Sequence, residues 1–83
     1  MENFIKDLKA VRTLGCIFMD NESHLKMEFR ADVEDYNVDE DAVNIYCDKG
    51  TEINLPKSQC KIIHDDEGYI FEYEKYTLML MVA

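Results

Sequence analysis

The pattern of apolar and polar positions changes halfway along residues 69–83. Aromatic residues at odd positions alternate with Glu72 and Glu74 over residues 69–74, which is the pattern of a strand with one buried face. From residue 78 onward every side chain is apolar, as in a strand buried on both faces. We therefore predict strands over about 69–74 and 76–82. The second should lie in the middle of a sheet, with cover on each face.

Residues 3–14 have the period of an amphipathic helix. Phe4, Leu8 and Val11 recur at the spacing i, i+4, i+7, and Gly15 follows where a helix-ending glycine is common. A helix of this length is marginal alone, so its apolar stripe is expected to cover one face of the sheet.

Five further stretches predict strands because they are apolar or alternating and are bounded by turn-forming residues. They span about 16–19, 24–30, 42–47, 51–55 and 59–63. Chain length leaves room for one compact domain over residues 1–83. The predicted class is α+β, with one N-terminal helix packed on an antiparallel sheet or half-barrel of five to seven short strands.

Charge is distributed unevenly along this pattern. The chain has 18 acids and 9 bases, a net charge of −9; residues 1–30 carry five of each, and residues 31–83 carry thirteen acids and four bases. Such a field disfavours direct binding to nucleic acid or anionic lipid and favours a basic partner protein. In the alternative interpretation, the charge only keeps a small domain soluble.

The acidic residues gather in a run over residues 32–41 and in a turn over residues 65–67. The run is either a solvated connector or an electronegative surface in which Tyr36 supplies contact area. Tyr46 falls opposite Val43 and Ile45 in the strand alternation and is expected to be exposed. The predicted partner-binding residues are Asp32, Glu34, Asp35, Tyr36, Asp39, Glu40, Asp41, Asp65, Asp66 and Glu67.

Metal-binding patterns are incomplete. Acidic and amide residues at 35, 37, 39 and 41 have the spacing of early calcium ligands, but Glu40 stands where the loop needs glycine and Tyr46 where it needs a bidentate glutamate. Cys60 and His64 could share a strand face, without the paired half-site typical of zinc. We predict no metal and no cofactor, with weak metal binding at either place left open.

Catalytic signatures are also missing from the sequence. Glu72 and Glu74 form a carboxylate pair of a kind that surface strands often carry, and no nucleophile and base occur together. We therefore predict that the protein is not an enzyme. Three cysteines without a secretory signal favour a reduced, cytoplasmic protein, and the longest apolar run is far below the ~20 residues of a membrane span.

The leading hypothesis is a small acidic binding protein that docks on a basic, nucleic-acid-binding surface of a partner, such as a nuclease, and inhibits it by occlusion. In size, acidity and fold class it resembles phage- or mobile-element-encoded inhibitors, including anti-CRISPR and anti-restriction proteins, and no residue role is carried over from them. The alternative is a structural or assembly subunit that forms a homodimer or larger homo-oligomer through its sheet. A charge at Met79 or Met81 would then abolish association.

Overall fold

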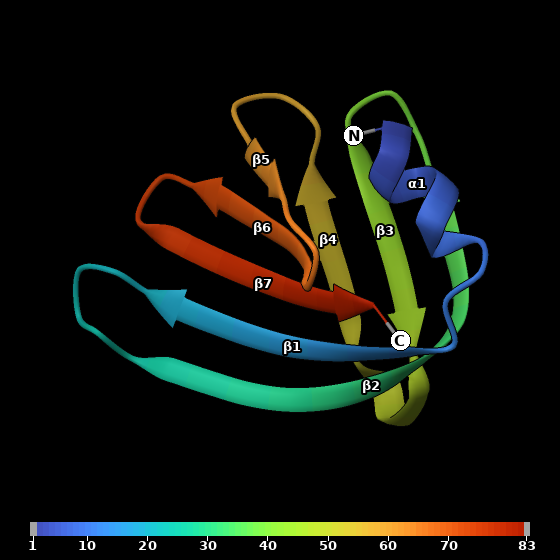
Figure 1. Ribbon diagram of the computed structural model, residues 1–83, viewed down its shortest axis with the longest axis horizontal. Coiled ribbons are helices and arrows are strands. Elements are labelled where there is room, and N and C mark those ends of the chain that lie inside the picture. The colour runs from blue at the N-terminus through green and yellow to red at the C-terminus, as the bar shows by residue number, and fades with distance from the viewer. Residues whose placement is uncertain (1, 83) are drawn as a thin grey trace.

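The computed structural model describes residues 2–82, which form one short helix, a 3₁₀ turn and seven strands (Figure 1). Met1 and Ala83, which the predicted domain includes, lie outside the described residues. The predicted strands 42–47 and 76–82 have the observed bounds. The elements are α1 (Glu2–Leu8), β1 (Thr13–Asp20), β2 (Lys26–Val38), β3 (Ala42–Cys47), η1 (Asp48–Gly50), β4 (Glu52–Pro56), β5 (Lys61–His64), β6 (Gly68–Tyr73) and β7 (Tyr76–Val82).

All seven strands join one open antiparallel sheet in the order β4-β3-β2-β1-β7-β6-β5. It consists of two meanders, β1 to β4 and β5 to β7, which are joined where β1 pairs with β7. The prediction that residues 76–82 form an interior strand is confirmed, because β7 lies between β1 and β6. The open sheet and its helix agree with the predicted α+β class.

The sheet bends so strongly that its two ends form separate layers (Figure 1). In Figure 1 the second half of β2, with β3 and β4, runs across the direction of β1, β7 and β6. Residues 57–60 join β4 to β5, the strands at opposite edges, so the ends of these strands lie within about 18 Å along the chain. The two edges are nevertheless unpaired with each other.

The long strand β2 corrects the interpretation of residues 32–41 as a connector. Residues 32–38 are strand, and a β-bulge lies between Val33 and Asp35. The bulge changes the phase of the alternation, so that Val33 and Tyr36 on either side of it both pair with inward-facing residues of β3. Burial of these apolar side chains explains why a charged segment is extended.

The helix is shorter than predicted, and the expectation that it reaches residue 14 was wrong. α1 ends at Leu8, while Thr13 and Leu14 begin β1. Thr13 pairs with β2, and Leu14 pairs with β2 on one side and β7 on the other. Val11 is still buried, although it follows the helix. Gly15 lies within β1 and ends no helix. No helix within residues 2–82 is long and apolar enough to cross a membrane.

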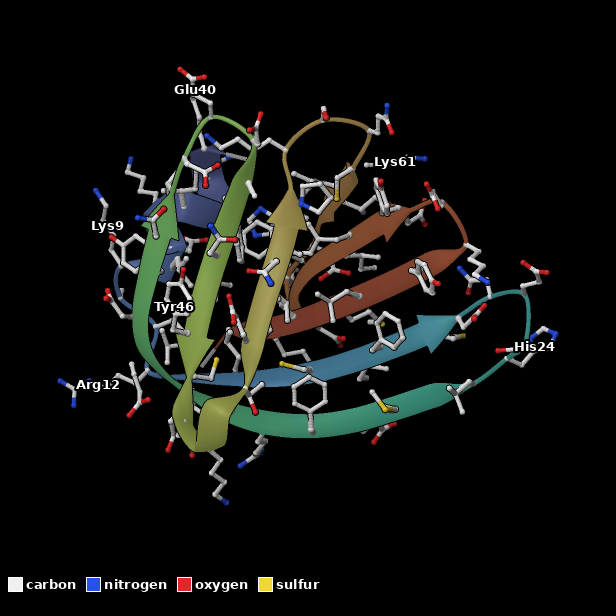
Figure 2. The ribbon with its side chains drawn as sticks, turned by 180° about the vertical axis from the view of Figure 1, so that it is seen from behind. Lys9, Arg12, His24, Glu40, Tyr46 and Lys61 are labelled. Atoms are coloured by element: carbon white, nitrogen blue, oxygen red, sulfur yellow. The ribbon has the colours of Figure 1, made fainter. Side chains whose placement is uncertain are left out.

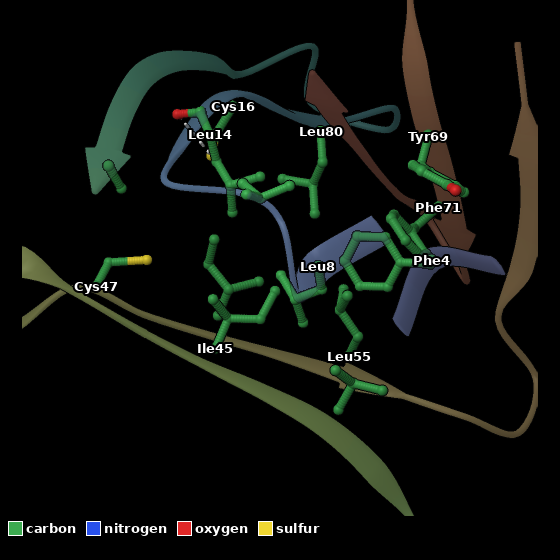
Figure 3. Close-up of a cluster of buried hydrophobic side chains, with 14 residues drawn as sticks. Phe4, Leu8, Leu14, Cys16, Ile45, Cys47, Leu55, Tyr69, Phe71 and Leu80 are labelled. Carbon is green, nitrogen blue, oxygen red and sulfur yellow. Dashed lines mark hydrogen bonds between the residues drawn. The ribbon is translucent and has the colours of Figure 1, made fainter. Parts of the chain in front are cut away.

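The core lies between the two layers, at the end of the sheet that α1 covers (Figure 3). Phe4 and Leu8 of the helix are 1% and 2% exposed, and Leu14, Ile45 and Leu80 are fully buried. The predicted role of the helix as cover for one face is therefore confirmed. The outer face of β7 has no such cover within the described chain, since Met81 is 37% exposed. The expected cover on both faces was wrong.

Candidate functional site

Most of the negative charge lies in one layer of the fold. Residues 31–56, which we call the acidic layer, comprise the second half of β2, β3, η1 and β4 with their turns, and they carry eight acids against the single base Lys49, a net −7 of the total −9. Seven of the eight acidic residues are exposed, and Asp48 is half-buried. The acids are Asp32, Glu34, Asp35, Asp39, Glu40, Asp41, Asp48 and Glu52.

The charge of this layer is not neutralised by ion pairs. The salt bridges of the described chain join Lys26 to Glu28 and Lys75 to Asp20 and Glu22, all outside residues 31–56. Among described residues, no acid of the layer therefore has a cation within ion-pair distance. Charges that lack close counterions project their field into solvent over roughly a Debye length, ~8 Å at physiological salt.

The turn between β2 and β3 is held by Asp39. Its carboxylate accepts hydrogen bonds from the backbone N–H groups of Ala42 at 2.7 Å and Asp41 at 2.8 Å. These two bonds, with smaller contributions from Asn44 and Lys57, lower the pKa of Asp39 below its ordinary value of 3.8. The turn presents Glu40 at its tip (Figure 2). Asp39 thus forms the turn, whereas the side chains of Glu40 and Asp41 are available to contact a partner.

At the other end of the layer, Asp32 is held by two bonds. Thr13 Oγ1 donates to its carboxylate at 3.0 Å, and its own N–H donates to the Asp48 carboxylate at 3.0 Å. Asp48, which lies outside the predicted site, thereby joins η1 to β2. The predicted residues Glu34 and Asp35 lie at the bulge and are exposed.

Two tyrosines in this layer lie on opposite sides of it. Tyr36, a predicted contact residue, is half-buried and packs against the core. Tyr46 is 38% exposed, as expected (Figure 2). It pairs in register with Asp35 on β2 and with Glu52 on β4. An exposed ring among carboxylates suits contact with arginine. Tyr46 and Glu52 were absent from the predicted site, although the alternation of β3 indicated the exposure of Tyr46.

The second acidic turn is separate from the first. Residues 65–67 connect β5 to β6, and Asp65 accepts hydrogen bonds from the N–H groups of Glu67 and Gly68 at 2.9 and 3.1 Å. This turn and the β2–β3 turn lie well apart in Figure 1. No hydrogen bond or ion pair within residues 2–82 joins them. The structure therefore does not bring Asp66 and Glu67 together with Glu40 and Asp41.

Side chains suited to metal binding or nucleophilic catalysis are dispersed. Within residues 2–82, no three His, Cys, Asp or Glu side chains gather as metal ligands would. His64 instead stacks its ring on Tyr69, with 4.2 Å between ring centroids. Glu74 lies in the β6–β7 turn with φ of 51°, so it does not share a strand with Glu72 as predicted.

The thiols are poorly suited to chemistry at neutral pH. Burial, together with the nearby Cys47, raises the pKa of Cys16 to about 11. Burial also raises the pKa of Cys47 and of Cys60. Because the thiolate is the reactive form, a raised pKa lowers the reactive fraction of each of these thiols near pH 7.

No family model, curated protein or solved structure matches this chain.

Proposed function

We propose that this protein is a non-catalytic binding protein whose acidic layer docks on a basic surface of a partner protein. The observation that supports the proposal is the net charge of −7 over residues 31–56, whose acids form no ion pair with any described residue. A field of this sign accelerates encounter with a basic surface and selects against acidic ones.

The layer combines charge with contact area. Tyr46 lies between the strands that carry Asp35 and Glu52, so an arginine could contact the ring and a carboxylate together. Where the basic surface of the partner normally binds nucleic acid, occupation by the acidic layer blocks that site. Inhibition by occlusion is the functional consequence that we propose for such a partner.

The test is a capture experiment from a cell lysate at about 50 mM and about 500 mM salt, which span weak and strong screening. The bait is the wild type or the variant Glu34→Gln/Glu40→Gln/Asp41→Asn/Glu52→Gln, which spares the turn-forming Asp39. The control, Asp66→Asn/Glu67→Gln, removes exposed charge outside the layer. We expect a basic protein on wild type and control at low salt only. Equal capture by the layer variant contradicts the proposal.

Competition then tests occlusion. Short duplex DNA is added to the captured pair, and the bound partner is measured. Displacement of the partner by DNA supports a shared nucleic-acid site. Binding of DNA and this protein at the same time contradicts occlusion, while the docking proposal stands.

A second candidate function is self-assembly through the outer face of the sheet. In register across β1, β7, β6 and β5, Ile17, Met79, Ile70 and Ile63 form an apolar row on that face. Ile63 is 38% exposed. Charges of both signs border the row, so two copies would not repel each other there as two acidic layers would. The bordering charges are Lys26, Glu28, Arg30, Lys61 and Glu72.

Sedimentation velocity distinguishes this candidate. If the outer face mediates self-assembly, we expect the wild type to be a dimer at roughly 100 μM, within the concentration range of weak association. The Met79→Lys variant should be a monomer. The layer variant Glu34→Gln/Glu40→Gln/Asp41→Asn/Glu52→Gln should leave the dimer intact. A monomeric wild type removes this candidate.

A further inference from the structure

The inner face of the sheet is mostly apolar, but α1 covers only one end of it. At the other end, where the β1–β2 and β6–β7 hairpins extend beyond β4 (Figure 1), a cavity of about 220 Å³ opens beside β4. No residue of α1 lines it. Its lining is almost entirely apolar and aromatic, and includes Phe18, Leu55, Phe71, Tyr73, Tyr76 and Leu78.

A second hollow continues the first along β4. It has a volume of about 280 Å³ and shares Phe18, Asn54 and Leu78 with the first cavity. Met27, which is 51% exposed, lies in its lining. Together the two hollows form one groove whose floor is the inner face of β1, β2 and β7, and whose wall is β4. This groove is larger than one ring or one side chain.

The wall of the groove is an open strand edge. Backbone bonds from Cys47 N–H to the Thr51 carbonyl and from Lys57 N–H to the Asp41 carbonyl, both 2.8 Å, fix the phase of the β3–β4 ladder. Because hydrogen-bonded residues alternate in an antiparallel pair, Ile53 and Leu55 bond to β3. Glu52 and Asn54 therefore direct their N–H and C=O groups away from β3, towards the groove.

An extended peptide segment matches both features. A strand placed beside β4 would satisfy the free backbone groups of Glu52 and Asn54 and would extend the acidic layer over the uncovered floor of the groove. Its side chains would alternate between the groove and the outer surface. On the outer surface they would lie beside Glu52 in the acidic layer, which favours lysine or arginine at those positions.

We propose that this groove binds an extended segment of the partner protein in which apolar residues alternate with lysine or arginine, and that the segment adds to the sheet at β4. The inference rests on the proposed function and specifies the chemistry of the partner. Charge argues against a second copy as the occupant. Pairing of two β4 edges would bring two acidic layers, each of net −7, side by side.

The experiment uses blocked, fluorescently labelled ten-residue peptides and measures their anisotropy with the full chain. One peptide alternates valine and lysine, and its isomer has the same residues in two blocks. We expect the alternating peptide to bind at least about tenfold more tightly, which corresponds to ~1.4 kcal/mol. Equal affinities overturn the inference and leave electrostatic docking standing. Absence of binding by either peptide overturns it too, and the lysate capture then decides the proposed function separately.

Backbone hydrogen bonding between the peptide and β4 is tested with two further versions of the alternating peptide. In one, the backbone amide nitrogens of all lysines are methylated, and in the other those of all valines. Only one set of amides faces β4, so one methylated peptide should lose binding at least about tenfold. Unchanged binding of both overturns edge addition. On the protein, Asn54→Pro removes an N–H that makes no bond to β3, and a similar loss is expected with the fold retained.

The floor of the groove is tested with a matched pair. Met27→Gln removes apolar lining without adding charge, whereas Leu25→Gln changes a residue that is 61% exposed and lies outside the groove. We expect weaker binding of the alternating peptide by Met27→Gln alone. Equal effects of the two substitutions count against the groove as the binding surface. Thermal unfolding of each variant verifies that it is folded.

Discussion

The Tyr69 hydroxyl on β6 donates a hydrogen bond to the Asp7 carboxylate on α1, across 62 positions of sequence. Phe4, one turn earlier in the helix, packs edge-on against the rings of Tyr69 and Phe71, with centroid distances of 5.1 and 4.9 Å. The helix is thus fixed to the sheet by one polar and two aromatic contacts. Burial, the hydrogen bond and the charge of Asp7 raise the pKa of Tyr69 to about 12.

Replacement of Tyr69 by phenylalanine keeps the ring and removes the bond to Asp7. We expect the free energy of unfolding at pH 7 to fall by about 1 kcal/mol, the typical value of a hydrogen bond. The pKa of Tyr69 is raised above its ordinary value of 10.0, so its contribution is present below pH 10 and is lost as the pH rises towards 12. Urea unfolding at pH 7 to 11 measures both effects. The exposed Tyr46→Phe is the control, and an equal loss there contradicts the assignment.

Gly68 tests the close approach of β6 to β7. A Cβ on Gly68 would collide with the Leu80 carbonyl oxygen and lie 3.0 Å from Met81 Cα. We expect Gly68→Ala to destabilise the protein by on the order of 3 kcal/mol, because backbone cannot yield as side chains do. Gly50 also has a positive φ, 75°, but open space around it, so Gly50→Ala should cost only about 1 kcal/mol. Thermal unfolding compares them, and equal effects would contradict this packing.

Leu14 measures the contribution of the core at the centre of the sheet. Its side chain is fully buried between the layers. Leu14→Ala should cost about 2–5 kcal/mol, which is a large fraction of the stability of a small domain. Leu25→Ala, at a residue that is 61% exposed, should change stability by less than about 0.5 kcal/mol. Denaturant unfolding measures the free energy of unfolding of both variants. Equal losses would contradict the burial of Leu14 and the exposure of Leu25.

Acid should destabilise the β2–β3 turn through Asp39. The pKa of this carboxyl is lowered by the N–H groups of Ala42 and Asp41, so its contribution is present above pH 3.8 and is lost as the pH falls through the lower, folded-state pKa. Asp39→Asn should be less stable than wild type at pH 6, with a smaller difference near pH 2. Nuclear magnetic resonance titration of the carboxyl measures the pKa directly. An unshifted value contradicts the hydrogen-bonded turn.

Much of the sheet could be predicted because strand signals are local. The predicted strands 42–47 and 76–82 match β3 and β7, and the apolar run from Leu78 correctly indicated an interior strand. The helix end could not be predicted, because Thr13 and Leu14 gain partners on β2 and β7 that lie far away in the sequence. Pairing on two sides outweighed the helical spacing of Val11.

The surface was less predictable than the sheet. The sequence located the acidic run, but the bulge between Val33 and Asp35 determines which face each residue occupies. Tyr36 therefore turns towards the core, whereas Tyr46, on the regular strand β3, is exposed as the alternation predicted. The open edge of β4 could not be predicted at all, because edges depend on strand order, and strand order depends on the pairing of β1 with β7.

The pairing of β1 with β7 also governs how fast the chain can fold. Leu14 pairs with Val82 and Asp20 with Tyr76, so this ladder closes the longest loop in the sheet, whereas the other strand pairs join neighbours in sequence. Loop-closure entropy must be lost before these contacts form, so we expect the β1–β7 ladder to form more slowly than the hairpins on either side of it. Until β7 docks, β1 and β7 each expose a long apolar edge, which makes the refolding chain prone to aggregate during that interval.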